Sequence, residues 1–241
     1  MNERFKKFCE DFSRLLGEAG DTEAVIAAGR ETVGALAADT EWFRAVAEEA
    51  LVDGTLLGGK RPSLWPNEIS LYREPDGEFL VFLYLWDGET RDAIHDHGAW
   101  GIVSTCAGVI REVKYRRRDD GSREGYADLE KTAENILKPG DTTFVLPGDE
   151  GIHCMINDET HPAVTVNVYG RPRRRGFVRF FDAEKKRVYR VYPPRATKEV
   201  LLVRALAALG DERSRRVLER AALMDMPAYL REEYDKALRR S

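Results

Sequence analysis

The middle of the chain, from residue 69 to about 192, consists of short apolar or alternating segments separated by turn residues. Pro75-Asp76-Gly77, between residues 69–72 and 79–86, is typical of a β-hairpin turn. The other strand candidates share this texture and are residues 93–97, 101–106, 110–115, 142–145, 153–157, 163–169 and 177–181. Many short strands at close spacing predict a barrel or a sandwich.

Both ends of the chain are helical in pattern. Apolar side chains recur at three- and four-residue steps from Phe5 to Leu16, and again from Val200 to Leu223. Gly20-Asp21 breaks the first helix, and Asp21 is a candidate cap for the next. We therefore predict N-terminal helices packed on the barrel (1–62), a central barrel with the functional site (63–195) and a C-terminal helical extension (196–241).

Composition excludes several classes of protein. The net charge of −4 favours neither nucleic-acid nor membrane binding, and we interpret the basic clusters 116–118 and 173–175 as a solvated rim. No apolar run approaches the roughly 18 residues of a membrane span, and no signal-peptide pattern opens the chain. The three cysteines form no C-x-x-C pair, which predicts reduced thiols in a cytoplasmic protein.

Three of the four histidines lie in strand candidates. Residues two apart in a strand share a face, so His95 and His97 project together while Asp96 points the other way. A barrel can bring His153 beside them from a distant strand. Neutral imidazoles suit iron, copper, nickel or zinc, and three protein ligands leave coordination positions open for catalysis or ligand binding. The alternative is a pair of strand histidines with ordinary hydrogen-bond partners.

The surroundings of these histidines resemble the two sequence motifs of the cupin superfamily. The residues that resemble the first motif are Gly88, His95, His97 and Gly108. Those that resemble the second are Gly140, Pro147, Gly148, His153 and Asn157. Cupins of the common pattern carry a ligand glutamate shortly after H-x-H, whereas residues 98–102 here contain no carboxylate. The resemblance therefore implies a double-stranded β-helix (jelly-roll) barrel, mainly β, with α-helical extensions and a ligand set of three histidines.

That variant resembles the thiol dioxygenases, meaning cysteine dioxygenase and its bacterial relatives that act on mercapto-acids such as 3-mercaptopropionate. The matching residues are Trp86, 94–101, 151–153 and 161–170, within a region of resemblance from about 69 to 190. The family implies Fe(II) as the cofactor, and zinc or nickel could occupy the same site in purified protein.

The family's Ser-His-Tyr relay corresponds here to Thr165, Asn167 and Tyr169, which share one strand face. Asparagine keeps hydrogen-bonding capacity but cannot titrate near neutrality as histidine does. The resemblance thus implies catalytic roles for these three residues. The alternative for Tyr169 is simple packing in the barrel.

The sequence offers no cysteine suited to a crosslink with Tyr169. Animal cysteine dioxygenases crosslink their tyrosine to a cysteine shortly after H-x-H, where this chain has Gly101. The register of Cys106 does not match, so we predict no crosslink. Strand alternation points Cys154 away from the metal, as a buried structural residue.

A substrate carboxylate would need a cation near the metal. By resemblance, Arg179 is the first candidate and Arg73 the second, with Trp100 as a further substrate contact. The alternative, that both arginines lie on the surface, stays open. His161 precedes a proline in a turn and is predicted to be exposed.

These observations predict an Fe(II)-dependent dioxygenase that oxidises a small thiol to a sulfinate with O2. One alternative is a three-histidine iron dioxygenase acting on a non-thiol substrate such as a diketone. Another is a non-catalytic metal-binding sensor whose C-terminal helices are its output surface. The expected partners are a small thiol and O2, without nucleic acid or membrane, in a possible homodimer.

Overall fold

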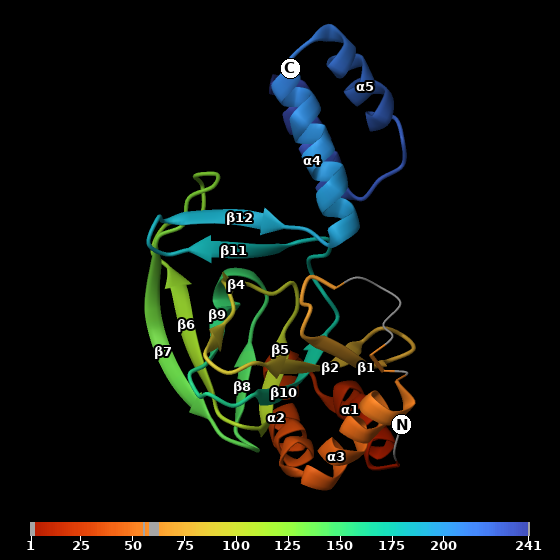
Figure 1. The fold of residues 1–241 in the computed structure, drawn as a ribbon, viewed down its shortest axis with the longest axis vertical. Coiled ribbons are helices and arrows are strands. Elements are labelled where there is room, and N and C mark those ends of the chain that lie inside the picture. Colours follow the sequence, from red (N-terminus) through yellow and green to blue (C-terminus); the bar gives the residue numbers. More distant parts are fainter. Residues whose placement is uncertain (1–2, 55, 58–62, 241) are drawn as a thin grey trace.

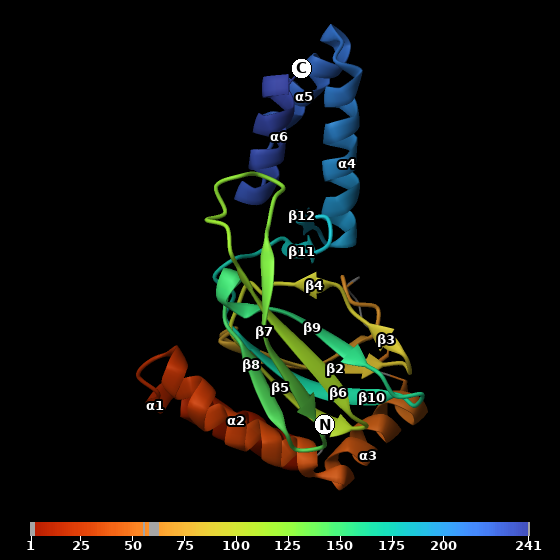
Figure 2. The ribbon, with the colours of Figure 1, turned by 90° about the vertical axis from the view of Figure 1, so that its left-hand side faces the viewer.

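The computed structural model describes residues 3–54, 56–57 and 63–240, and its centre is a β-barrel of two antiparallel sheets (Figure 1). Helices near the N-terminus cover one sheet, and helices near the C-terminus form a separate lobe at the far end of the molecule (Figures 1 and 2). The prediction of a mainly β jelly-roll barrel with helical extensions at both ends is confirmed.

The first sheet has five strands, of which β10 is the middle one. In spatial order they are β1 (Glu68–Arg73), β2 (Phe79–Trp86), β10 (Ala163–Gly170), β5 (Gly101–Ala107) and β8 (Thr142–Val145). Almost all of β10 is buried, because helices cover one of its faces and the second sheet covers the other. Its valines pack towards the helices, whereas Thr165, Asn167 and Tyr169 alternate with them and face the barrel interior.

The second sheet has seven strands and carries the histidines. Its main path is β12 (Arg187–Val191), β11 (Val178–Asp182), β4 (Ile94–His95), β9 (Ile152–Asn157), β6 (Ile110–Arg117) and β7 (Leu129–Leu137), with β3 (Thr90–Arg91) paired to β9. Pairing of the very short β4 with β9 joins two segments that are far apart in the sequence. His95 lies directly opposite His153 in that pairing.

The N-terminal helices are α1 (Glu3–Glu18), α2 (Thr22–Ala38) and α3 (Thr40–Glu48), followed by the π-helical turn η1 (Glu49–Asp53). Asp21 caps α2 as predicted, since its side chain accepts from the backbone nitrogen of Ala24 at 2.9 Å. Helix α2 approaches the five-stranded sheet so closely that a Cβ at Gly29 would lie 2.7 Å from Ile102 Cδ1. A larger residue at this contact would require the Ile102 side chain to move.

The C-terminal lobe consists of α4 (Pro194–Leu209), α5 (Glu212–Ala222) and α6 (Ala228–Arg240). Its small core includes Val203, Leu218 and Tyr234. An ion pair between Arg190 of β12 and Glu232 of α6, at 2.6 Å, ties the lobe to the barrel. Among the helices within the described ranges, none is both long and apolar enough to cross a membrane.

Candidate metal centre

The barrel brings His95, His97 and His153 together. His95 ends β4, His97 follows it in an isolated bridge to Pro147, and His153 lies in β9. One nitrogen from each ring belongs to a set whose members all lie within 4.8 Å of one another. Pairing of β4 with β9 thus supplies the third ligand predicted from the sequence.

Hydrogen bonds fix which nitrogen of two of these rings would face a bound metal ion. His153 Nδ1 lies 2.8 Å from Glu112 Oε1, and His95 Nδ1 lies 2.9 Å from the carbonyl oxygen of Ala93. Both oxygens only accept, so each Nδ1 carries the hydrogen and each neutral ring keeps a lone pair on Nε2. Residues outside the ligand set have therefore oriented the rings for coordination.

The spacing of the free nitrogens also fits one ion. The Nε2 atoms of His97 and His153 are 2.9 Å apart. Two nitrogens bound at right angles to one ion, each at about 2.1 Å, would be about 3.0 Å apart. The donor set of three neutral imidazoles suits Fe(II), nickel or zinc.

Glu112 accepts a hydrogen bond from His153 Nδ1, and this role was not predicted from the sequence. This buried carboxylate also accepts from Thr143 Oγ1 at 2.6 Å and from Asn135 Nδ2 at 2.9 Å. Burial alone would raise the pKa of Glu112, but the His153 hydrogen bond and the Lys114 charge hold it below its ordinary value. The signal in the sequence was an acidic residue on the same strand face as Ile110, two residues away.

The three rings differ in their electrostatic surroundings. Burial and the neighbouring histidines lower the pKa of His97 well below its ordinary value. Burial also lowers the pKa of His153, despite the opposing effect of Glu112. Burial alone would lower the pKa of His95 too, but Asp92, 3.4 Å from its Nδ1, raises it. Neutral His97 and His153 are ready to bind a cation.

Asp96 points away from the histidines, as strand alternation predicted, and is completely buried. Arg174 donates to both of its carboxylate oxygens, at 2.7 and 2.5 Å, and Arg179 Nε donates to Oδ2 at 2.5 Å. Burial would raise the pKa of Asp96, but these two guanidinium groups lower it. Asp96 is therefore an ionised structural residue and not a metal ligand.

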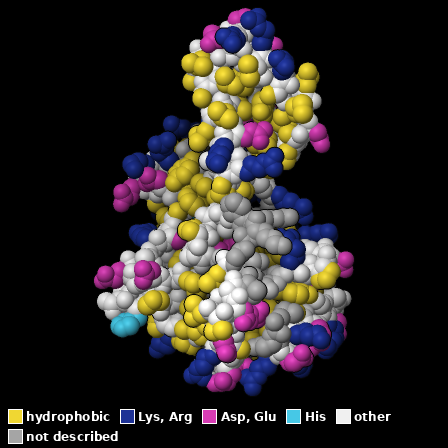
Figure 3. All heavy atoms as spheres, turned by 45° about the vertical axis from the view of Figure 1, so that its right-hand side comes forward, with side chains coloured by type: hydrophobic (Ala, Val, Ile, Leu, Met, Phe, Trp, Pro, Cys, Tyr) yellow, Lys and Arg dark blue, Asp and Glu magenta, His cyan; other side chains and the backbone are white. Residues whose placement is uncertain are grey.

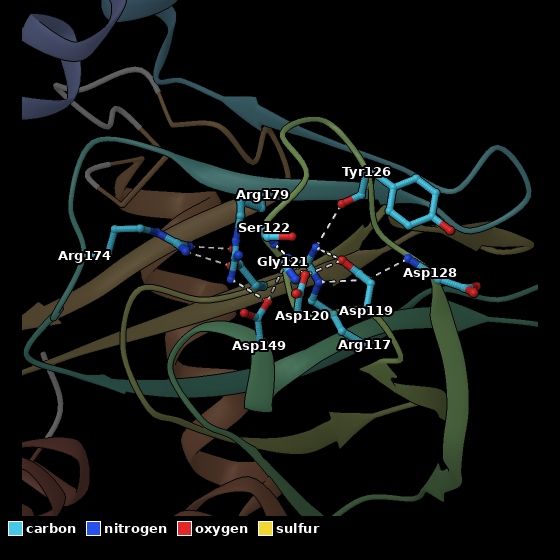
Figure 4. A network of polar contacts seen from close by, with 11 residues as sticks. Arg117, Asp119, Asp120, Gly121, Ser122, Tyr126, Asp128, Asp149, Arg174 and Arg179 are labelled. Carbon is cyan, nitrogen blue, oxygen red and sulfur yellow. Dashed lines mark hydrogen bonds and ion pairs between the residues drawn. The ribbon is translucent and has the colours of Figure 1, made fainter.

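The ion pairs continue from Arg179 towards the loop between β6 and β7 (Figure 4). Arg179 Nη2 lies 2.9 Å from Asp149, which in turn lies 3.6 Å from Arg117. Arg117 then pairs with Asp119 at 2.5 Å. The result is a chain of alternating charges on the outer side of the histidine centre.

None of the three predicted substrate contacts lies in the histidine cavity. The Arg179 guanidinium, expected to face inward, is instead engaged by the carboxylates of Asp96 and Asp149. Arg73 is exposed at the end of β1. Trp100 packs in the core near Phe12, on the helix-covered side of the sheet. Strand alternation alone could not show that Asp96 is buried and that two arginines, Arg174 and Arg179, neutralise it.

The cavity next to the histidines is small, about 20 Å³, enough for about one water molecule. Its walls are mostly aromatic. They are formed by Trp65, Tyr84, Trp86, Asp92, Met155, Asn167, Tyr169 and the three histidines. Of these, Trp65, Tyr84, Asp92 and Met155 were not singled out from the sequence, although Met155 lies only two residues after His153.

Two of the three relay residues reach the cavity. The Tyr169 ring stacks on His97 with centroids 5.2 Å apart, and Asn167 Nδ2 donates to the Tyr169 hydroxyl at 3.0 Å. Thr165 instead accepts from Trp86 Nε1 at 3.1 Å, so it holds a wall residue in place. Burial raises the pKa of Tyr169 far above its ordinary value, which keeps the phenol neutral.

Gly101 provides the space that the Tyr169 ring fills. A Cβ at Gly101 would lie 2.5 Å from the ring. Cys106 belongs to the core on the helix side, and Cys154 packs with Ile94 behind β9. His161 is exposed as predicted.

Comparison with known proteins finds no matching family model and no matching curated protein. Several solved structures with a similar arrangement are described as cupins. A cupin 2 conserved barrel domain protein from Rhodopseudomonas palustris is 13% identical and has a TM-score of 0.37, over 48% of this chain and 67% of that one. A cupin-superfamily sugar phosphate isomerase from Silicibacter pomeroyi is 20% identical with a TM-score of 0.33, over 55% and 85%.

A third example is the Cupin_2 domain of an XRE family transcriptional regulator from Enterobacter cloacae. It is 15% identical with a TM-score of 0.31, over 44% of this chain and 96% of that one. Such similarities concern the barrel fold, and they carry no conclusion about activity. The sheet order and the histidine cluster together define a cupin-type barrel with a candidate three-histidine metal centre.

Proposed function

We propose that this chain is an Fe(II)-dependent dioxygenase that oxidises a small thiol to a sulfinate. The supporting observation is the ligand set: three imidazoles without a carboxylate, two of them with tautomers fixed for coordination, beside a partly buried tyrosine. Three neutral ligands preserve the charge of the ion and leave positions open for small ligands.

The reaction adds both atoms of O2 to the substrate sulfur, so that R–SH and O2 give R–SO2H. Bound iron would supply the redox chemistry that no side chain can perform. His95, His97 and His153 would hold the ion, and Glu112 would keep His153 in the correct tautomer.

Tyr169 and Asn167 provide the hydrogen bonds of the cavity. Because Asn167 donates to the Tyr169 oxygen, the phenol hydrogen is free to point elsewhere. The raised pKa of Tyr169 keeps that hydrogen in place at neutral pH. Tyr169 therefore serves as a neutral donor to substrate or oxygen. Aromatic walls limit access of water to the reacting sulfur.

The cavity walls favour a thiol without a carboxylate. Within the part of the chain that the structure describes, no Arg or Lys lines the cavity. Asp92 does line it, and its buried Oδ1 has no hydrogen-bond donor, although His95 Nδ1, which donates to Ala93, lies 3.4 Å away. An ammonium group would supply that donor, and Trp65 and Trp86 can face a cation. We therefore favour an amine-bearing thiol over the mercapto-acids first expected.

Oxygen uptake by Fe(II)-loaded protein tests the proposal. The panel is cysteamine, cysteine, 3-mercaptopropionate, mercaptosuccinate and a diketone, with mass spectrometry of the products. We expect uptake with cysteamine and equal formation of its sulfinate. Turnover of the diketone alone would contradict the thiol substrate. Absence of uptake with every compound, at one bound iron per chain, would contradict the enzyme and favour a sensor.

Asp92→Asn tests the substrate preference separately. We expect kcat/KM for cysteamine to fall about tenfold relative to kcat/KM for 2-mercaptoethanol, which has no charge. Both values come from the same variant, so any change in iron binding cancels in the ratio. An unchanged ratio would remove Asp92 from substrate recognition.

A further inference from the structure

The histidine cavity is too small for the substrate proposed above. Its volume is about 20 Å³, whereas even a short thiol such as cysteamine has several non-hydrogen atoms and needs several times that space. His95 and His153 are buried, with 3% and 2% exposed, and histidine side chains, cyan in Figure 3, are hardly visible on the face shown there. Part of the cavity wall must therefore move before a substrate can reach the three histidines.

Most of the cavity wall is held in place by the barrel. Besides the histidines, the wall residues that lie in strands β2, β9 and β10 are Tyr84, Trp86, Met155, Asn167 and Tyr169. Asp92 lies between strands, but its backbone nitrogen donates to the Met155 carbonyl oxygen at 3.0 Å. The His97 carbonyl oxygen accepts from the backbone nitrogen of Gly148 at 2.8 Å. Movement of any of these residues would break hydrogen bonds between distant parts of the chain.

Trp65 is held differently. It lies in the loop before β1 and lines the cavity, yet it remains partly exposed to solvent. Among the described residues its backbone hydrogen bonds are local, because its nitrogen donates to Ser63 Oγ at 3.1 Å and its carbonyl oxygen accepts from Glu68 N at 3.2 Å. Its ring packs with centroids 4.9 Å from His95 and 5.6 Å from Phe180. Displacing this ring would thus cost ring contacts but no hydrogen bond of either sheet.

We propose that Trp65 is the gate of the histidine cavity: its indole turns away from His95 to admit the substrate and then closes over it. Glu68 fixes the base of the gate, since its carboxylate accepts from the hydroxyl of the wall residue Tyr84 at 2.8 Å. Closure would exclude water from the reacting sulfur, as active-site lids do. The closed indole would also face the substrate ammonium. The gate rests on the proposed function in one respect, the size of the ligand that must enter.

A gate of this kind discriminates between ligands by size. A diatomic ligand such as cyanide needs little more space than the cavity already offers, so it enters without displacing Trp65. A ring such as imidazole must wait until the indole turns away. At high concentration the binding rate of imidazole is therefore limited by opening of the gate and becomes constant. The rate for cyanide instead keeps rising in proportion to its concentration.

Stopped-flow absorbance of the full chain loaded with Co(II), which three imidazoles also suit, measures both rates. Trp65→Ala should raise the limiting rate for imidazole about tenfold and change the rate for cyanide less than about twofold. The control is Tyr189→Ala, which removes an exposed ring that also contacts Phe180, at 6.1 Å, but does not line the cavity. It should leave both rates unchanged. An unaltered imidazole rate in Trp65→Ala, or equal acceleration of both ligands, would overturn the proposal.

Tryptophan fluorescence follows the motion of Trp65 itself. Bound Co(II) quenches a nearby indole, so imidazole binding should raise the emission at the limiting rate seen by absorbance, because the ring moves away from the ion. Trp65→Phe keeps an aromatic ring for folding, and in it this change should disappear although Trp86 still lines the cavity. A change that persists in Trp65→Phe would overturn the gate. Neither measurement uses O2, so absence of turnover with every thiol would contradict the dioxygenase and leave the gate standing.

Discussion

The segment from His95 to His97 carries buried polar groups on both sides, and the two sides are stabilised in opposite ways. On the inner side the surroundings keep His97 neutral and orient its partners through single hydrogen bonds. On the outer side Asp96 is ionised and held by two guanidinium groups. The comparison teaches that neighbouring residues in one short segment can differ in role: the inner side carries the candidate metal site, and the outer side carries a buried ion-pair network.

The largest effect should come from His97→Ala on the inner side. Loss of one of three ligands should abolish iron retention and thiol oxidation, while the metal-free protein unfolds within about 3 °C of the wild type. Iron content after desalting and a thermal melt measure the two effects. The control is His161→Ala, which changes an exposed histidine. A His97→Ala protein with one iron per chain and full activity would contradict the metal centre.

Asp96→Asn on the outer side should lower the stability of the fold more than it affects iron binding. It leaves Arg174 and Arg179 without their buried counter-charge, and should lower the free energy of unfolding by about 3–5 kcal/mol. Urea denaturation of the metal-free protein measures the change. Asp158→Asn removes an exposed partner of Arg111 and should cost less than about 1 kcal/mol. Equal losses in the two variants would refute the structural role of Asp96.

Glu112→Gln should have an intermediate effect, on metal affinity more than on folding. The variant loses the negative charge that orients His153, and iron affinity should fall by about 10- to 100-fold. Competition with a chelator measures that affinity. Glu134→Gln, an exposed change on the adjacent β7, should leave it unaltered. Unchanged affinity in Glu112→Gln would show that backbone packing alone orients His153.

The smallest effect concerns the far end of the outer charge network, at Asp119. The Arg117 hydrogen bond lowers the pKa of Asp119 from 3.8 to about 2. A depressed carboxyl pKa stabilises the fold above pH 3.8, and this contribution disappears as pH falls towards 2. Because Asp119 is partly exposed, we expect about 1–2 kcal/mol. Urea melts between pH 5 and 2.5 should show a shallower loss in Asp119→Asn, and identical slopes would contradict this.

Strands with a clear apolar pattern were predicted well. The expected strand 101–106 corresponds to β5 (Gly101–Ala107), and 163–169 to β10 (Ala163–Gly170). Besides the two-residue β3 (Thr90–Arg91), two strands were missed, β7 (Leu129–Leu137) and β12 (Arg187–Val191). Both lie at edges of the seven-stranded sheet and are rich in charged residues. An edge strand has few neighbours to bury it, so its sequence carries little apolar periodicity.

By itself the sequence determined the parts that depend on local spacing. Period two placed His95 and His97 on one face and Asp96 on the other, and it aligned Asn167 with Tyr169. The absence of a carboxylate in residues 98–102 was also readable directly, whereas the position of Gly101 beside Tyr169 came from the family resemblance and from the pairing of β5 with β10.

Only the tertiary structure decided which distant groups complete those faces. Glu112 reaches His153 across β6 and β9, and Arg179 turns to Asp96 and away from the cavity. Both outcomes follow from burial, because a polar group removed from water must find a partner wherever the chain offers one. That choice depends on packing between elements, which local periodicity does not encode.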